Sequence, residues 1–410
     1  MRIGIAGPVT ASMLADLVQD GKAIPDCYSF PYVSQLARSY HQQGHEIAVF
    51  ATSTAIDSPQ SFQGPRCTID IVPLRPRAFG RSLDRWSDER RALVKVMRER
   101  ACTVIHAHWT YEFALAAQAG GCPCLITAHD APWTVVNHHT GLKNKMYRAL
   151  RALMADKVLR NASQLTVVSP YLGEYYRRRH GYRGTLHLIG NGLPDKNFSQ
   201  PRPRPAIGAP FTFAAILNGF DRLKNTHVLL RAWEKTHHHL PFACLRLYGT
   251  DHGPGEACQR WAIKENLLCT NVEFRGRTPN DRIQADLSCE IDALVHPAVE
   301  ESFCIAVLEA MSKGLPCIGG KNAGGLPWVM GDGIAGPLID TSDPLALSNA
   351  LISTANNPVS SEKWGAAGYQ RAHTMFRLDR VTSSYLELLT ALAAGNTILN
   401  SAHGSSSPSC

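Results

Sequence analysis

Short apolar runs alternate with longer segments of helical pattern along most of the chain. The runs are MRIGIAG, HEIAVFAT, CTVIHAHW, CLITAHD and SQLTVVS in the first half, and FTFAAIL, ACLRLYG, NVEFRGR, DALVHPA and LPCIGG in the second. Such alternation is typical of βαβ units, whose strands form parallel sheets. The pattern therefore predicts an α/β fold.

The length and composition allow two such domains. The chain has 410 residues, of which 44% are hydrophobic and 19% charged, as in a globular protein rather than a disordered one. Repeated prolines in residues 197–210 predict a semi-rigid linker. We therefore expect a first domain over residues 1–196, a second over residues 211–371, and a solvated tail rich in Ser, Gly and Asn over residues 396–410.

The stretch from His296 to Gly320 carries the clearest functional pattern. The run 293–295 predicts a buried strand, the cluster 300–302 suits the N-cap of a helix, and Gly314 and Pro316 end that helix. Amide groups at a helix start lack partners and favour an anion such as a diphosphate. In this stretch the amides would be those of Ser302, Phe303 and Cys304.

Two glutamates bracket the predicted helix start. Glu301 lies at the end of the loop and Glu309 about two turns further along. Each carboxylate could accept hydrogen bonds from the hydroxyl groups of a nucleotide sugar. Alternatively, Glu301 complements the helix dipole and Glu309 is a solvated helix residue, and the spacing alone leaves both interpretations open.

These residues resemble a motif of the retaining nucleotide-sugar glycosyltransferases of family 4. The family motif has the form E-S-F-G-x4-E-A, and this chain has Glu301-Ser302-Phe303-Cys304 followed by Glu309-Ala310. The resemblance implies that Glu301 holds sugar hydroxyls and that Glu309 holds the ribose. Cys304 departs from the family glycine, which lets the backbone approach a phosphate without a Cβ in the way.

Two cations follow the first strand of the second half, where a βα loop would face a ligand. Arg222 and Lys224 could neutralise the charge that develops on a leaving diphosphate, or they could be ordinary surface charges. The family usually has an arginine five residues before this lysine, but Gly219 stands at that position here. Whether Arg222 replaces the family arginine is open.

Histidines lie at strand ends in the first half of the chain. His108 ends one predicted strand, and His129 and Asp130 follow the next. The family has a histidine near the reacting carbon in a similar T-x-H loop, which implies this role for His129 and places His108 and Asp130 on the acceptor side; a purely structural histidine is the alternative. Gly7, in a short glycine turn, resembles the family's first loop, where the backbone nears the donor diphosphate or the acceptor. Arg277 occupies the usual base-side loop.

The resemblance implies the GT-B fold, with two Rossmann-like doubly wound domains facing across a cleft. It places the donor on the C-terminal domain and returns a helix at about residues 372–395 to the first domain. The implied reaction moves a sugar, with retention, from a UDP- or GDP-linked donor to a saccharide or lipid-linked saccharide, in bacterial cell-surface polysaccharide or lipopolysaccharide synthesis. An epimerase of the same fold and a non-catalytic saccharide- or lipid-binding protein are the alternatives.

We expect neither a metal nor another cofactor. No D-x-D pair follows a strand, and the histidine run 237–239 lacks partner ligands at a suitable spacing. The 12 cysteines show no C-x-x-C pair, which favours reduced thiols in a cytoplasm.

The formal net charge is +8, and part of it concentrates in residues 142–160. Six cations there interleave with an apolar stripe: Lys143, Lys145, Arg148, Arg151, Lys157 and Arg160 with Met146, Leu150, Leu153 and Met154. The helix could pack its stripe on the core, or it could contact an anionic membrane surface, helped by the arginines at 177–179. We expect no nucleic acid partner, because no recognised binding motif is present.

Overall fold

The computed structural model describes residues 1–138 and 141–395. Contacts within the chain divide it into two compact units, and the chain passes from one unit to the other at Gly192/Leu193 and again at Arg377/Leu378. The first unit begins at Met1 and takes up the chain again from Leu378, and the second is Leu193–Arg377. The expected tail, 396–410, lies outside the described residues. Among those that are described, no helix is long and apolar enough to cross a membrane.

The first unit is built on an eight-stranded sheet of order β3-β4-β2-β1-β5-β6-β7-β8. All pairs are parallel except β3 with β4. The strands are β1 (Arg2–Ala6), β2 (Glu46–Ser53), β3 (Gln60–Gln63), β4 (Cys67–Pro73), β5 (Val104–His108), β6 (Cys124–Ala128), β7 (Gln164–Val167) and β8 (Thr185–Leu188).

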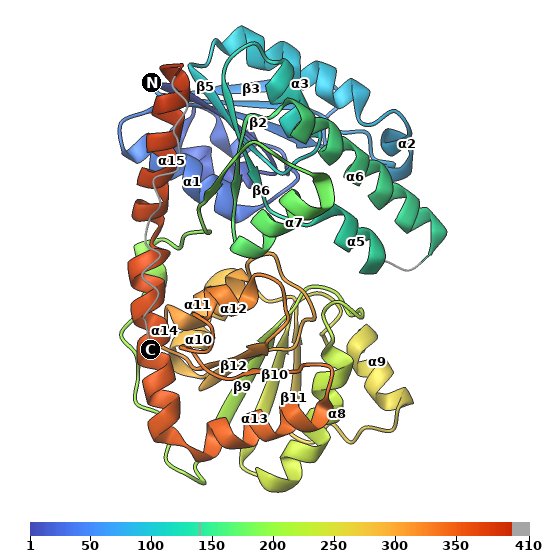
Figure 1. Ribbon diagram of the computed structural model, residues 1–410, viewed down its shortest axis with the longest axis vertical. Helices are drawn as coiled ribbons and strands as arrows, with labels where there is room; N and C mark the ends of the chain where they lie inside the picture. The colour runs from blue at the N-terminus through green and yellow to red at the C-terminus, as the bar shows by residue number, and fades with distance from the viewer. Residues whose placement is uncertain (139–140, 396–410) are drawn as a thin grey trace. The chain divides into compact units, whose positions relative to one another are not determined.

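Helices cover both faces of this sheet (Figure 1). One face is covered by α1 (Pro31–Gln42) and α15 (Leu378–Ala393), and the core there contains Ile3, Ile5 and Tyr385. The other face carries α3 (Ser87–Arg100) and α4 (Glu112–Ala119), and α6 (Leu142–Asn161) packs against α4. The remaining helices are α2 (Ala78–Leu83), α5 (Pro132–His138) and α7 (Pro170–His180), with short 3₁₀ turns at Ala11–Leu17 and Gly21–Ala23.

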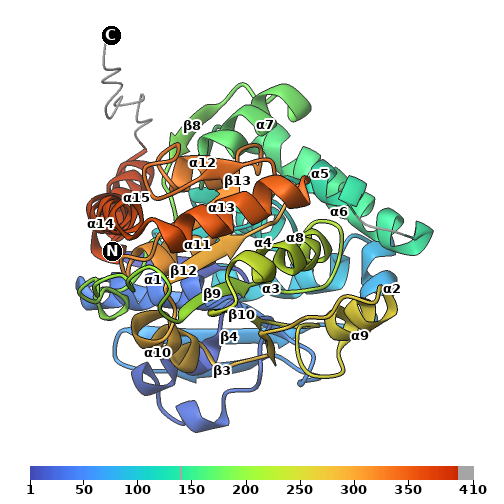
Figure 2. The same ribbon diagram turned by 90° about the horizontal axis from the view of Figure 1, so that it is seen from below.

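The second unit has a six-stranded parallel sheet of order β11-β10-β9-β12-β13-β14 (Figure 2). The strands are β9 (Phe211–Ile216), β10 (Ala243–Tyr248), β11 (Val272–Gly276), β12 (Ala293–His296), β13 (Cys317–Gly320) and β14 (Leu338–Ile339). The helices are α8 (Thr226–His239), α9 (Ala257–Lys264), α10 (Asn280–Cys289), α11 (Ile305–Met311), α12 (Leu326–Val329), α13 (Pro344–Asn356) and α14 (Pro358–Met375), and a 3₁₀ turn spans Asp195–Asn197. The core contains Phe213, Trp233 and Leu351.

The boundary between the units differs from the expected one. The proline-rich segment 197–210 is not a free spacer, because Arg202 forms an ion pair with Asp292 at 2.6 Å and Arg204 donates to the carbonyl of the same residue at 2.9 Å. These bonds place the segment on the second unit. The expected helix at 372–395 is two helices: α14 ends at Met375 in the second unit, and α15 packs against α1, β5 and β6 in the first.

Candidate active site

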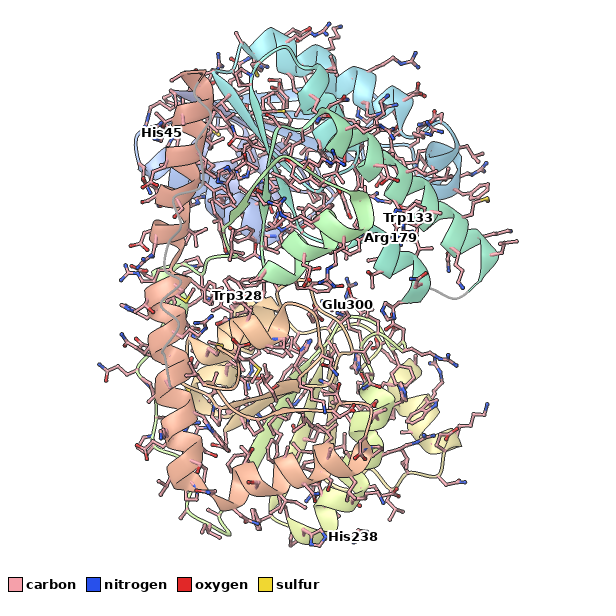
Figure 3. The ribbon with its side chains drawn as sticks, viewed as in Figure 1. His45, Trp133, Arg179, His238, Glu300 and Trp328 are labelled. Carbon is pink, nitrogen blue, oxygen red and sulfur yellow. The ribbon has the colours of Figure 1, made fainter. Side chains whose placement is uncertain are left out.

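In the second unit, the loop between β12 and α11 holds Glu301 at the carboxyl end of the sheet. The Glu301 backbone is fixed against the turn that follows β13: its N–H donates to the carbonyl of Ala323 at 3.3 Å, and its carbonyl accepts from the N–H of Gly325 at 2.7 Å. In Figure 3, the labelled Glu300 directly precedes Glu301, and the labelled Trp328 belongs to α12, which follows this turn. The G-G-x-P turn, residues 324–327, therefore helps to fix the position of the Glu301 backbone.

Two side chains meet one oxygen of Glu301. Lys224 Nζ lies 2.7 Å from Oε1, and His296 Nε2 lies 3.0 Å from the same atom. Burial alone would raise the pKa of Glu301, but the charge of Lys224 and the hydrogen bond from His296 outweigh it and lower the pKa to about 2. The second oxygen, Oε2, takes no hydrogen bond within the described part of the chain. Glu301 is thus a charged acceptor with one oxygen left for a ligand.

Lys224 responds to the same pair in the opposite sense. Burial would lower its pKa, but attraction to Glu301 more than compensates and raises it. Its backbone N–H donates to Asp221 Oδ1 at 2.9 Å, which fixes the turn ahead of α8. The structure therefore brings together Lys224 and Glu301, which the sequence analysis proposed separately. His296, the third partner, was not proposed, and only its place at the end of a strand could have indicated it.

The helix after Glu301 starts later than predicted. Ser302 and Phe303 lie in a turn before the helix. The N-cap is therefore Cys304, and α11 begins at Ile305. The first helical amides thus belong to Ile305 and its successors, and of the three predicted donors only Cys304 stands at the cap. Cys304 has φ = 77°, in the left-handed region that favours glycine, so the residue that departs from the family motif keeps the backbone shape of a glycine.

Phe303 is used for packing. Its ring is 3% exposed and makes edge contacts with Trp328 and Phe376, with centroids 6.1 and 5.4 Å away. Arg371 lies over the rings of Trp328 and Phe376 and donates to the backbone of α12. This aromatic cluster holds the turn beneath α11 in place.

Glu309 differs from Glu301 in its surroundings. Burial raises the pKa of Glu309 to about 7, against the opposing influence of Asn280, Lys313 and Gln284. Asn280 Nδ2 lies 3.5 Å from Glu309 Oε1, at the start of α10. The side-chain nitrogen and oxygen of Gln284 are both buried, and neither forms a hydrogen bond with another described residue. The sequence contained no signal for Asn280 or Gln284, which approach Glu309 only because α10 and α11 are neighbours in the fold.

The two arginines expected at the donor form no hydrogen bond or ion pair with Lys224 or Glu301 among the described residues. Arg222 is exposed and lines a surface pocket of about 340 Å³ together with Phe220, His227, Arg231 and Trp261. Arg277 is exposed just beyond the end of β11. Neither forms an ion pair within residues 1–138 and 141–395.

In the first unit, the histidines form a connected group at the carboxyl end of the sheet. His108 Nδ1 and His129 Nε2 are 2.9 Å apart, and His106 contacts Tyr40 and Thr127 at 3.0 and 2.7 Å. Burial lowers the pKa of His129 to about 3, and it lowers the pKa of His108 as well. These histidines are therefore neutral near pH 7 and serve as hydrogen-bonding groups.

The surroundings of His129 are aromatic, and Gly7 lies close to the neighbouring His108. A Cβ on Gly7 would lie 3.0 Å from the Cβ of His108, a tight contact that the glycine avoids. The rings of Trp109, Phe30 and Tyr32 surround His129, with centroids 4.5, 5.8 and 6.2 Å away. Sequence reasoning missed these three aromatic residues, because Phe30 belongs to a segment without any recognisable motif.

The carboxylate of Asp130 is hydrogen-bonded to Tyr111 and does not join the histidine group. Its Oδ2 accepts from the hydroxyl of Tyr111 at 2.7 Å, whereas Oδ1 is buried without a partner among the described residues. Burial raises the pKa of Asp130, against the hydrogen bond from Tyr111. The described residues contain no cluster of three His, Cys, Asp or Glu side chains suited to a metal ion.

Comparisons with known proteins identify the family of the chain. Residues 31–196 match the family described as Glycosyltransferase Family 4, and residues 203–371 match Glycosyl transferases group 1. The O-antigen chain mannosyltransferase C of Escherichia coli is 26% identical over 275 residues, which are 65% of this chain and 71% of that protein. The D-inositol 3-phosphate glycosyltransferase of Streptomyces scabiei is 24% identical over 393 residues, which are 88% of this chain and 85% of that protein.

Solved structures show the same fold. Sucrose-phosphate synthase from Thermosynechococcus elongatus aligns with a TM-score of 0.75 at 20% identity, covering 97% of this chain and 100% of that one. Anabaena HepE, in complex with UDP and glucose, aligns with a TM-score of 0.67 at 17% identity, covering 95% and 100%. The two matches to family sequences together span most of the chain. The chain therefore belongs to glycosyltransferase family 4, a family of GT-B enzymes.

Proposed function

We propose that this glycosyltransferase moves a sugar, with retention, from a UDP- or GDP-linked donor to a saccharide or lipid-linked saccharide. The observation that carries the proposal is the arrangement at Glu301, where Lys224 and His296 share one carboxylate oxygen. A partly exposed carboxylate that stays charged and keeps an oxygen free is suited to accept hydroxyl hydrogen bonds. The adjacent ammonium is suited to a diphosphate.

In the proposed reaction, the acceptor hydroxyl attacks the anomeric carbon on the face from which the diphosphate leaves. The bond between that carbon and the diphosphate oxygen breaks, and the hydroxyl proton passes to an oxygen of the departing phosphate. Lys224 and the first amides of α11 stabilise the charge on the leaving group. His129, which is neutral, orients a sugar hydroxyl, and Glu309 binds the ribose.

The relatives support the acceptor class only in general terms. A protein named as an O-antigen mannosyltransferase is among them, and so is one named as an inositol phosphate glycosyltransferase. We assign this chain to bacterial cell-surface polysaccharide or lipopolysaccharide synthesis on the cytoplasmic side of the membrane. Contact of residues 142–160 with that membrane is part of the proposal. No divalent metal is included, because the cationic role falls to Lys224.

The first test is a thermal-shift screen of UDP, GDP and ADP, each with and without Mg²⁺. Stabilisation by one nucleotide without metal would support the donor site and identify the base. Donor consumption should then depend on an added acceptor. Consumption without acceptor would indicate the epimerase, and no stabilisation by any nucleotide would favour the non-catalytic binding protein.

A further inference from the structure

The helix α6 has a buried face and an exposed face, and both are apolar. The buried residues are Arg151, Ala152, Met154, Ala155, Val158 and Leu159. At roughly 100° per residue, they lie on one side of the helix. This side packs against α2, α4 and α5 within the first unit.

The opposite side carries a second apolar stripe that no described residue covers. Leu142, Met146 and Leu153 are 83%, 39% and 44% exposed. Helical spacing places all three within an arc of about 40°, diametrically across from the buried face. The sequence analysis left open whether the stripe of Met146, Leu150, Leu153 and Met154 packs on the core, and in the structure only Met154 of these four is fully buried.

Cations border the exposed stripe. By the same spacing, Lys143 and Lys145 lie on its two flanks, and Lys157 and Arg160 continue it. All four are exposed, and no ion pair engages them in the described chain. The single acid on α6, Asp156, is turned to His180 of α7. The exposed side of α6 therefore combines apolar side chains with uncompensated positive charge.

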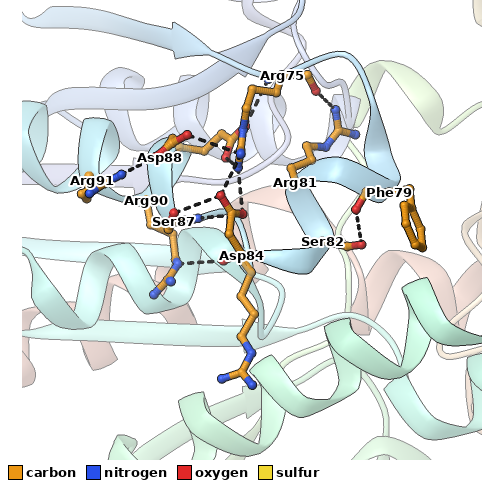
Figure 4. Close-up of polar contacts among 11 residues, drawn as sticks. Arg75, Phe79, Arg81, Ser82, Asp84, Ser87, Asp88, Arg90 and Arg91 are labelled. Carbon is orange, nitrogen blue, oxygen red and sulfur yellow. Dashed lines mark hydrogen bonds and ion pairs between the residues drawn. The ribbon is translucent and has the colours of Figure 1, made fainter.

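The helix α2 packs against α6 and carries exposed apolar side chains of its own, Phe79 and Leu83, which are 42% and 62% accessible. The acids that follow α2 are paired within the unit: Arg75 contacts Asp84 and Glu89 at 2.7 Å each and Asp88 at 3.3 Å (Figure 4). We call the exposed stripe of α6 with the cations that flank it the docking face, which comprises Leu142, Met146 and Leu153 with Lys143, Lys145, Lys157 and Arg160.

Charge and apolarity together select the partner. Exposed apolar side chains elsewhere stand on separate elements, such as Ile263 on α9, Leu345 on α13 and Val359 on α14. A second copy of the chain, docked through the same face, would bring like charges together. A nucleic acid would use the cations but would leave the leucines in water. An anionic bilayer accepts both, because its headgroups attract the lysines and its acyl boundary takes up the stripe.

We propose that the docking face seats this enzyme on an anionic phospholipid surface, with Leu142, Met146 and Leu153 at the boundary between headgroups and acyl chains. The proposal deepens the lipid-linked acceptor of the proposed function and rests on it for the choice of a bilayer. The other arginine cluster contributes less, because Arg179 lies over the ring of Trp133 at 5.1 Å (Figure 3).

Vesicle flotation of the full chain tests the proposal. The probes are phosphatidylcholine vesicles with and without phosphatidylglycerol. We expect binding to the anionic vesicles, weakened at least about tenfold by the combined changes Leu142→Ser, Met146→Ser and Leu153→Ser. The matched control is Ile263→Ser, Leu345→Ser and Val359→Ser, which removes exposed apolar side chains of the second unit and should change nothing. Lys143→Gln with Lys145→Gln should weaken binding and reduce its salt dependence.

Three results would overturn the proposal. The wild type could fail to float with anionic vesicles, the triple serine variant could float as the wild type does, or light scattering could reveal a dimer that the triple variant loses, which would assign the face to a second copy. Thermal shift with the nucleotide, measured on the same preparations, verifies that each variant is folded. It also separates the two claims, because nucleotide binding without flotation would refute the docking face and leave the transferase intact.

Discussion

The two units place ionisable side chains at the carboxyl ends of their strands in opposite electrostatic states. In the second unit, Glu301 is 18% exposed and remains charged, because Lys224 and His296 contact its oxygen. In the first unit, His108 and His129 are buried against each other without a carboxylate partner, and both are neutral. Burial disfavours charge unless an opposite charge lies within hydrogen-bond reach. Under the proposed function, we therefore expect the second unit to bind the charged part of the donor and the histidines of the first unit to bind uncharged hydroxyls.

The largest expected effect comes from removing the cation of the second unit. Lys224→Ala should lower turnover by about 100- to 1000-fold, because the leaving diphosphate loses its preorganised positive charge. Steady-state kinetics with the identified donor would measure it. The matched control is Lys235→Ala, an exposed lysine on α8, which should leave turnover unchanged. Near-wild-type turnover of Lys224→Ala would remove the lysine from the site.

The neutral state of the first unit predicts a loss of stability in acid. The pKa of His129 is about 3 in the folded chain, below the ordinary value of 6.5, so between these values the unfolded chain binds a proton that the folded chain does not. The folded state should therefore lose stability as the pH falls through this window, by about 2 kcal/mol between pH 6.5 and 5 for this one histidine.

Urea unfolding at pH 7 and pH 5 tests this prediction. His129→Phe should lose less stability than the wild type on acidification, whereas His238→Phe, which changes an exposed histidine of α8, should behave as the wild type (Figure 3). An equal loss in His129→Phe and the wild type would show that His129 is not held neutral.

Glu309 is intermediate between the charged Glu301 and the neutral histidines. Its titration should have a smaller effect than the changes described above. Burial raises its pKa to about 7 despite the opposing charge of Lys313, so the carboxyl group ionises near neutral pH. As a hydroxyl acceptor it should bind the ribose better when ionised, and nucleotide affinity should rise by about three- to tenfold between pH 6 and 8. Calorimetry would show this rise in the wild type and in Glu362→Gln, an exposed control, but not in Glu309→Gln. A rise that persists in Glu309→Gln would assign it to another group.

The smallest expected effect concerns the helix cap beside Glu301. Cys304→Gly removes a Cβ from a residue at φ = 77°. The relieved backbone strain is opposed by the greater freedom of glycine in the unfolded chain, so the free energy of unfolding should change by no more than about 1 kcal/mol. Nucleoside diphosphate affinity should increase by about threefold, because the backbone can approach the phosphate more closely. Calorimetry that finds weaker or unchanged binding would contradict this role of the Cβ.

The fold was predictable where the pattern was local. Each apolar run that predicted a strand contains one, and the order of strands and helices gave the correct fold class. The missed strands were β3, β4, β8 and β14. The first of these is a polar strand at the edge, antiparallel to its neighbour, and β14 has two residues, so neither carries an apolar run.

The domain boundary was misplaced for a physical reason. Prolines at 201–210 are typical of linkers, but Arg202 and Arg204 bond to Asp292, which lies far away in the sequence. No local pattern reveals such a partner. The same holds for His296 beside Glu301 and for Trp109 beside His129, whose roles depend on neighbouring strands and loops.

By itself, the sequence determined the alternation of strands and helices, the motif that carries Glu301 and Glu309, and the positions of Lys224 and His129 after strands. The tertiary structure decided which of these side chains meet, which carboxylate remains charged, and which stripe of α6 faces outward. Periodicity and motif spacing are properties of neighbours along the chain. Burial and ionic pairing arise between residues far apart in it, such as Lys224 and Glu301, and exist only once the sheet has brought their loops together.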